Sequence, residues 1–137
     1  MEETRTITNC VWRWQRPTEA EDEICGKISE VLSEACIIPG FFGYWFMRDA
    51  IMICVRDCKS PVQLCKQVYP EVAARNYSTE SSVEHGIRKT VKSSWELSSP
   101  QFKEKYFGAF GLLGNRQPTP KEFILTLAER ISRDNGF

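Results

Sequence analysis

Hydrophobic residues recur every three or four positions along most of the chain, which is the spacing of one face of an α-helix. In one stretch the interval is four residues throughout, at Val83, Ile87, Val91 and Trp95. Ser78 and Thr79 precede this stretch as candidate N-caps. Ser81 and Glu84 have the spacing of a capping box. The pattern predicts a helix that buries its apolar stripe and exposes its other side.

The first half of the chain predicts two further helices. Residues 19–35 open with acidic side chains, which favour a helix N-terminus. The inward positions of this helix are Ile24, Ile28, Val31, Leu32 and Ala35. The segment IIPGFFG at residues 37–43 predicts a turn, and residues 44–57, YWFMRDAIMICVRD, are apolar nearly all round. We therefore expect the helix over residues 44–57 to be central.

The C-terminal part predicts a short helix and a long one. Residues 99–108, SPQFKEKYFG, are expected to form a helix that ends at Gly108 as its C-cap. The glycine-rich segment AFGLLGNRQP then predicts a loop. The last helix begins with Thr119 as its cap, with Pro120 at the first position and Glu122 at N3. Its inward residues are Phe123, Ile124, Leu127 and Ile131.

The middle of the chain has the pattern of a helix-turn-helix over about residues 69–96. A short helix is predicted from Ser60–Pro61 and a second from about Pro70 to Arg75, since proline suits the first turn of a helix. A turn at Asn76–Tyr77 leads into the helix with the four-residue stripe. The small Ala73 allows the two helices to cross closely.

The fold class that these elements predict is all-α, a compact bundle of about six helices. Residues 1–18 differ from the rest because TRTITNCVWRW alternates polar with β-branched or aromatic residues and Pro17 follows. We expect a short strand-like N-terminal arm there, and one helical domain over residues 19–137. The arm, with Trp12 and Trp14, either mediates self-association or docks on the bundle, or it is a merely packed or frayed terminus.

Composition narrows the class of protein. Hydrophobic residues make up 42% of the chain and charged residues 26%, as in soluble globular proteins. No apolar run is long enough for a membrane span and no signal peptide is visible, so we expect a cytoplasmic location without a membrane partner. The six cysteines form no CxxC pair and His85 is the only histidine, so no metal site is expected.

An enzyme is not expected either. The sequence has no glycine-rich phosphate loop, no nucleophile elbow and no HExxH motif. We therefore predict no catalytic residues and no cofactor. Trp45, Phe46 and Met47 could line a pocket, but core packing is the expected role of such residues.

The exposed side of the predicted helix after Tyr77 is polar and partly basic. It presents Ser81, Ser82, Glu84, His85, Arg88, Lys89 and Lys92. Formal net charge is zero over the chain, but residues 36–137 hold fourteen Lys and Arg against ten Asp and Glu, so a neutral chain can still present a basic face. A helix fits the major groove of B-DNA, where each base pair presents a distinct set of donors and acceptors. The alternative is an ordinary solvated helix surface.

Three segments of the sequence resemble one known family. They are IPGFFGYWFMRDAI, then VYPEVAARNYSTESSVEHGIRKTVKSSW, and then FG followed by PTPKEFI. In this order and at these separations they are similar to the DNA-binding effector domain of the sporulation master response regulator, stage zero sporulation protein A, over about residues 28–134. The resemblance implies a six-helix domain that binds a short promoter element, often as tandem copies.

The resemblance also implies which residues contact DNA. Glu84 and Arg88 match the family's contacts, whereas Ser82, His85 and Lys89 stand where the family has Arg, Arg and His. Arg88 can hold guanine O6 and N7 with both prongs of its guanidinium, and Glu84 can accept from cytosine N4. Ser82 and His85 remain candidate base contacts, and Lys89, Lys92 and Arg75 are candidate phosphate contacts. A serine cannot replace a bidentate arginine, so affinity for the family's own element is expected to fall.

Two functions from different classes therefore remain. The first is a sequence-specific transcriptional regulator that binds double-stranded DNA, with a homodimer or tandem assembly and RNA polymerase as further partners. The second is a protein-interaction module or antagonist of a related regulator that does not bind DNA, favoured by the substituted positions and the aromatic residues 41–46. The family's receiver domain has no counterpart among the roughly 25 residues before the first shared helix, so phosphorylation control within this chain is not expected.

Overall fold

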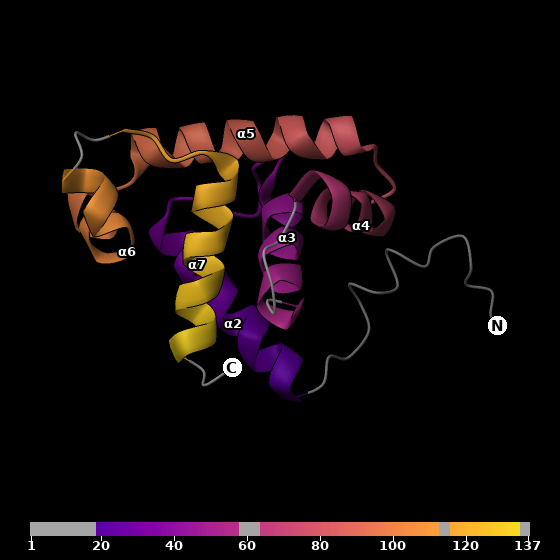
Figure 1. The fold of residues 1–137 in the computed structure, drawn as a ribbon, viewed down its shortest axis with the longest axis horizontal. Helices are drawn as coiled ribbons and strands as arrows, with labels where there is room; N and C mark the ends of the chain where they lie inside the picture. The colour runs from indigo at the N-terminus through magenta and orange to yellow at the C-terminus, as the bar shows by residue number, and fades with distance from the viewer. Residues whose placement is uncertain (1–18, 58–63, 113–115, 135–137) are drawn as a thin grey trace.

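A computed structural model of the chain describes residues 19–57, 64–112 and 116–134, and these residues form an all-α bundle (Figure 1). The predicted strand-like arm over residues 1–18 and the predicted helix start at Ser60–Pro61 lie outside the described residues. Within them, six α-helices and one π-helical turn follow one another. They are α2 (Glu19–Glu34), α3 (Tyr44–Asp57), η1 (Leu64–Val68), α4 (Tyr69–Arg75), α5 (Glu80–Leu97), α6 (Pro100–Leu112) and α7 (Pro120–Asp134).

The helix α3 is central, as its apolar sequence predicts. It packs against α2, α4, α5 and α7. In Figure 1 the long α5 lies along one side of the molecule, across the ends of α3 and α7, with α4 beside its N-terminal half and α6 near its C-terminal end. This arrangement leaves the side of α5 that faces away from α3 at the surface.

The core contains the inward residues that the helical periodicity predicts. The four members of the stripe on α5 are buried, as are the inward positions predicted for α2 and α7. Most of the largest fully buried side chains come from α2, α3, α5, α6 and α7, and they meet in one cluster. They include Ile28, Leu32, Met47, Ile51, Ile87, Phe107, Phe123, Leu127 and Ile131.

The turn after α2 ends the helix without a glycine. Cys36 has a φ of 63° and occupies the left-handed position after the helix. The N–H of Ile37 donates to the carbonyl of Leu32 at 2.8 Å, and the N–H of Cys36 donates to that of Ser33 at 3.0 Å. These two bonds form a Schellman motif, which satisfies the last carbonyls of α2. The predicted turn at residues 37–43 follows directly.

The prediction for residues 99–118 is wrong in one respect. Residues 109–112 are helical and not part of a loop, because α6 continues past Gly108 with a kink at Phe107, whose φ and ψ are −129° and 37°. Gly108 does not adopt the left-handed conformation of a C-cap. The kink places the buried Phe107 ring 5.4 Å from Trp95 and 5.5 Å from Phe123, measured between ring centroids. Burial of this ring between α5 and α7 explains why the chain bends there.

The short helices before α5 are continuous. The π-helical turn η1 runs directly into α4, with Pro70 in the first turn of α4 as predicted.

Among the described residues no helix is both long and apolar enough to cross a membrane.

Candidate nucleic-acid interface

The helices α4 and α5 form a helix-turn-helix whose turn is held by backbone hydrogen bonds. The N–H of Asn76 donates to the carbonyl of Val72 at 3.1 Å, and the N–H of Ser78 donates to that of Ala73 at 2.9 Å. Tyr77 supplies the left-handed residue of the turn, with a φ of 50°. Val72 and Ala73 are buried, so α4 packs closely on α5 as the small Ala73 predicts.

The helix α5 begins two residues earlier than a capping box at Ser81 requires. Thr79 is the N-cap, and its Oγ1 accepts a hydrogen bond from the N–H of Ser82 at 3.0 Å. Thr79 was one of the two predicted caps. The predicted box between Ser81 and Glu84 is wrong, because Ser81 already lies within the first turn of the helix.

A buried carboxylate ties this turn to the core. Asn76 Nδ2 donates to Asp49 Oδ2 at 2.9 Å and to the carbonyl of Val72 at 2.8 Å. Asp49 lies on α3 and is only 1% exposed, so its bond to Asn76 satisfies an acceptor away from water. The orientation of the turn, and hence of α5, is therefore fixed relative to α3. The residue patterns alone did not single out Asp49 for this role.

Two glycines set how closely α5 approaches α3. A Cβ atom added at Gly43 would collide with Thr90 Oγ1 and with the backbone of Gly86. Thr90 Oγ1 in turn donates to the carbonyl of Gly86 at 2.8 Å. The chain that leads into α3 thus lies directly against the backbone of α5. The periodicity did not reveal this crossing, because glycines carry no side-chain pattern.

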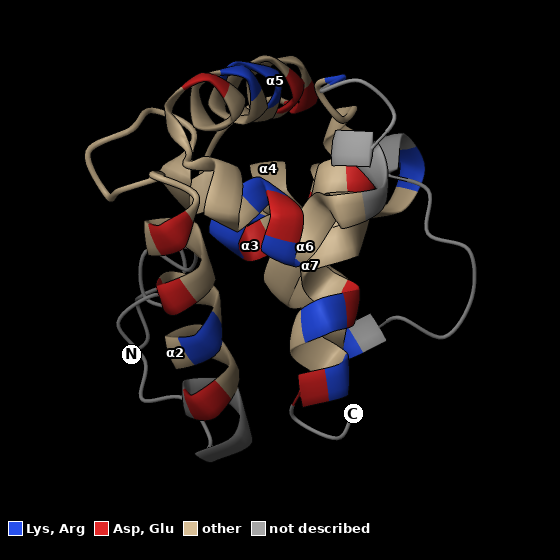
Figure 2. Ribbon diagram, turned by 90° about the vertical axis from the view of Figure 1, so that its left-hand side faces the viewer, with Lys and Arg blue, Asp and Glu red and all other residues tan. Residues whose placement is uncertain are grey.

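The predicted DNA-contact residues lie together on the outer side of α5. Glu84, His85, Arg88, Lys89 and Lys92 are exposed. The remaining one, Ser82, is half-buried. Among the described residues no neighbouring helix covers this side, and Figure 2 shows basic segments of α5 lying between acidic ones at the edge of the molecule.

The charges on this face are mixed. Glu80, Glu84 and Glu96 balance Arg88, Lys89 and Lys92 in number, so the cations occupy the middle of the helix between acidic residues. Arg88 and Glu84 form an ion pair at 3.1 Å, with side chains 56% and 52% exposed. Such an exposed pair contributes only about 0.3–0.5 kcal/mol, so either partner can be redirected cheaply. Among the described residues, Lys89 and Lys92 form no ion pair.

Arg75 does not belong to this face. Its guanidinium pairs with Glu71 at 2.7 Å and its side chain is only 15% exposed. Arg56 contacts the same Glu71 carboxylate at 3.2 Å, which links α3 to α4. Because its guanidinium is paired and largely covered, we do not expect Arg75 to contact phosphate.

The aromatic segment before and within α3 is divided between the core and the surface. Phe46 and Met47 are buried, whereas Phe42 is 67% exposed and Trp45 is 37% exposed. The guanidinium of Arg48 lies over the Trp45 ring, 5.2 Å from its centroid.

Within the described part of the chain, no three His, Cys, Asp or Glu side chains gather closely enough to hold a metal ion.

Comparison with known proteins bears directly on this geometry. The family model for the sporulation initiation factor Spo0A C terminal matches residues 28–131, which include the C-terminal part of α2, all of α3 to α6 and most of α7. Members of this family are DNA-binding, transcription-regulating domains, and it is not a known family of enzymes. The match covers most of the chain and contains the whole helix-turn-helix. The chain therefore belongs to the Spo0A C-terminal family of DNA-binding effector domains.

Proposed function

We propose that this chain is a sequence-specific transcriptional regulator that binds double-stranded DNA with α5 in the major groove. The observation that carries the proposal is the exposed outer side of α5, in a family of DNA-binding domains, with two lysines that have no acidic partner among the described residues. Lysines of this kind can neutralise phosphates and release counterions, which is the main source of affinity for DNA.

The residues on α5 divide into two roles. Arg88 and Glu84 read base edges, with His85 and Ser82 as additional readers, because arginine pairs with guanine and glutamate accepts from cytosine. Lys89 and Lys92 contact phosphates. The ion pair between Glu84 and Arg88 supports this division, since it orders the guanidinium before binding at little cost.

The target of this chain differs from the element that the family binds. Ser82, His85 and Lys89 replace residues that contact DNA in the family, and a lost bidentate contact costs about 1–3 kcal/mol. A homodimer or tandem arrangement on DNA would restore affinity by adding contacts, and RNA polymerase is a further candidate partner because it is the enzyme that a transcriptional regulator acts on. We include both partners in the proposal.

The test begins with selection of bound duplexes from a random pool. On the selected site, Arg88→Ala should lower the discrimination against scrambled DNA by about 1–3 kcal/mol, measured by fluorescence anisotropy. The matched control is Arg133→Ala on α7, because Arg133 also forms an exposed ion pair with a glutamate four residues earlier, at 3.7 Å. Equal losses from both variants, or equal loss on every sequence for Arg88→Ala, would contradict the assignment.

A protein-interaction module remains the second candidate, and one observation favours it. Ile38, Phe42 and Trp45 are large apolar residues that are exposed within eight positions of one another. Exposed aromatic residues are enriched in protein interfaces. A mobility shift on random duplex DNA separates the candidates, because even non-specific DNA binding is electrostatic and falls with salt. Absence of any salt-dependent shift would favour the interaction module.

A further inference from the structure

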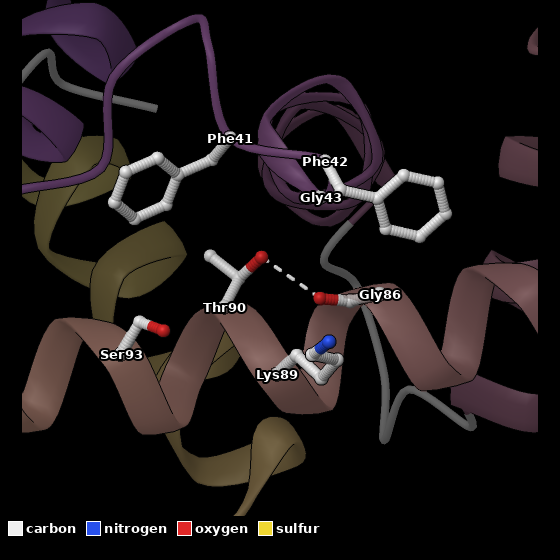
Figure 3. Close-up of a pocket in the computed structure, with 7 residues that line it drawn as sticks. All are labelled: Phe41, Phe42, Gly43, Gly86, Lys89, Thr90 and Ser93. Atoms are coloured by element: carbon white, nitrogen blue, oxygen red, sulfur yellow. Dashed lines mark hydrogen bonds between the residues drawn. The ribbon is translucent and has the colours of Figure 1, made fainter.

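A pocket of about 260 Å³ lies beside the candidate DNA-contact face, between α5 and the chain that enters α3 (Figure 3). One wall is formed by Phe41 and Phe42, and the other by side chains of α5. The residues that line it are Phe41, Phe42, Gly43, Gly86, Lys89, Thr90 and Ser93.

The floor of this pocket is backbone. Gly43 and Gly86 meet there without side chains, and the Thr90 hydroxyl is already committed to the Gly86 carbonyl. A Cβ at Gly86 would lie about 3 Å from the rings of Phe46 and Phe42, so a larger residue would intrude on the aromatic wall. The pocket therefore depends on the same glycine crossing that positions α5.

Helical geometry places the pocket at one margin of the exposed face. Successive residues of an α-helix are separated by about 100°, so Lys89 points about 100° away from Arg88. Ser82 and Ser93 lie on the same side as Lys89, seven residues before it and four residues after it. Glu84 and Arg88 form the opposite margin. When α5 lies in the major groove with Glu84 and Arg88 toward the bases, the pocket margin faces the backbone of a flanking strand.

We infer that this pocket receives one sugar–phosphate unit of the DNA backbone. The phosphate binds Lys89 Nζ and the Ser93 hydroxyl, both of which are groups that commonly contact phosphate oxygens. The C–H face of the deoxyribose packs on the exposed Phe42 ring and on Phe41. This inference rests on the proposed function, because it assigns a part of the same DNA to a second surface beside α5.

The size and the chemistry of the pocket favour this occupant over a small-molecule effector. Ligand pockets commonly enclose about 300–1,000 Å³ and bury most of the ligand. This pocket is smaller, and the Phe42 side chain at its edge is 67% exposed. Both features suit a unit of the DNA backbone that binds reversibly at the protein surface. A contact of this kind fixes the register of α5 on the duplex without reading sequence.

The experiment combines protein variants with chemically altered DNA. Duplexes of the selected site carry a single methylphosphonate, which removes one backbone charge, at each position in turn. We expect one position where this change weakens wild-type binding about tenfold but leaves Lys89→Gln unaffected, because the lost charge–charge contact is the same in both cases. The matched control is Lys27→Gln, since Lys27 is exposed on α2, away from α5.

Two further variants test the rest of the pocket. Phe42→Ala should weaken binding about three- to tenfold on every sequence without changing the slope of log K against log salt, whereas Lys89→Gln should reduce that slope by about 0.9. Ser93→Ala should lose affinity only on duplexes that retain the phosphate found above. Because Phe42 is mostly exposed, its variant is expected to keep the fold, which urea unfolding verifies.

The outcomes separate this inference from the proposed function. If the effects of the methylphosphonate and of Lys89→Gln simply add at every phosphate, while Arg88→Ala still loses discrimination, the pocket proposal is overturned and the proposed DNA recognition stands. Coupling of Lys89 to one phosphate, together with weaker binding by Phe42→Ala, supports the pocket. Failure of the wild-type chain to bind any duplex would overturn both proposals.

Discussion

The helices α5 and α7 are built alike but differ in what their exposed faces do. Each starts with a threonine cap and buries an apolar stripe in the same core. On α7 both arginines pair with close neighbours, Arg130 at 3.4 Å from Asp134 and Arg133 at 3.7 Å from Glu129, whereas Lys121 in the first turn forms no ion pair among the described residues. On α5 only Arg88 has such a pair, whereas Lys89 and Lys92 form none among the described residues.

The difference indicates which helix surface is ready for a charged partner. A cation that already pairs with a carboxylate must break that pair before it can bind a phosphate, whereas an unpaired lysine exchanges only water and salt ions. Hydrophobic periodicity is the same in both helices, so it identifies the buried side of each but does not distinguish a solvated surface from a binding surface. The pairing of the exposed cations distinguishes the two surfaces in part, since two lysines of α5 but only one lysine of α7 form no ion pair among the described residues.

The largest expected effect comes from the close contact between α5 and the chain that enters α3. Gly43→Ala should destabilise the protein by about 1–3 kcal/mol, because the new Cβ collides with Thr90 and with the backbone of Gly86. To relieve this collision, α5 should move relative to α3, and DNA binding should weaken as a result. Urea unfolding gives the stability, and anisotropy gives the affinity.

The control for this change is Gly26→Ala. Gly26 lies within α2, and a Cβ added there would meet no atom within 4 Å. Alanine at this site should stabilise the protein by about 0.5–1 kcal/mol, since glycine is unfavourable within a helix. If Gly43→Ala were as stable as Gly26→Ala, close contact between α3 and α5 would not be what holds α5 in place.

Much of the fold could be predicted from the sequence, because local patterns determine it. The bounds of α3 and the start of α7 follow from amphipathic periodicity and from the threonine, proline and glutamate at residues 119–122. The kink at Phe107 could not be predicted, because it depends on the contacts of this ring with Trp95 and Phe123, which are distant in sequence. There Gly108 suggested a cap, and tertiary packing overrode that signal.

Less of the candidate site than of the fold could be predicted from the sequence. The exposed side of α5 follows from its buried stripe, which is a local property. Two other features depend on packing between elements: the bond between Asp49 and Asn76, and the crossing of Gly43 on Gly86. A third, the pairing of Arg75 with Glu71, lies within α4. Even the last pair, only four residues apart, required knowledge that Arg75 is largely covered. Sequence thus indicated which residues face outward, and the structure shows which of them have partners.

The N-caps provide a prediction of intermediate size. On α7 the cap is reciprocal, since the N–H of Glu122 donates to Thr119 Oγ1 at 3.1 Å and the N–H of Thr119 donates to Glu122 Oε1 at 2.9 Å. On α5 Thr79 accepts a bond from the N–H of Ser82, and a serine at that position cannot return a carboxylate bond. Thr79→Ala should therefore cost about 1 kcal/mol at both pH 7 and pH 3.

The contribution of Glu122 should instead depend on pH. Its bond from the Thr119 backbone N–H, with help from Arg116, lowers the pKa of Glu122 below its ordinary value of 4.5. A lowered pKa in the folded state stabilises the protein above the ordinary pKa, and this stabilisation is lost as the pH falls through the lowered value. Thermal or urea unfolding between pH 7 and pH 3 should show Glu122→Gln converging on the wild type as the pH falls. A constant difference across this range would rule out the carboxylate as the source.

The smallest expected effects on stability come from the exposed ion pairs, and here α5 and α7 should behave alike in folding and differently in binding. Glu129→Ala on α7 and Glu84→Ala on α5 each remove one partner of an exposed pair, so each should change the free energy of unfolding by less than about 0.5 kcal/mol. Only Glu84→Ala should alter which base is preferred at one position of the selected site, because the acceptor for cytosine N4 is lost. If neither variant changes base preference, Glu84 is an ordinary surface residue and the exposed charges of the two helices are equivalent in this respect. If Glu84→Ala relaxes the base preference while the free energy of unfolding stays the same, the Glu84 carboxylate contributes to DNA recognition and not to the stability of the fold.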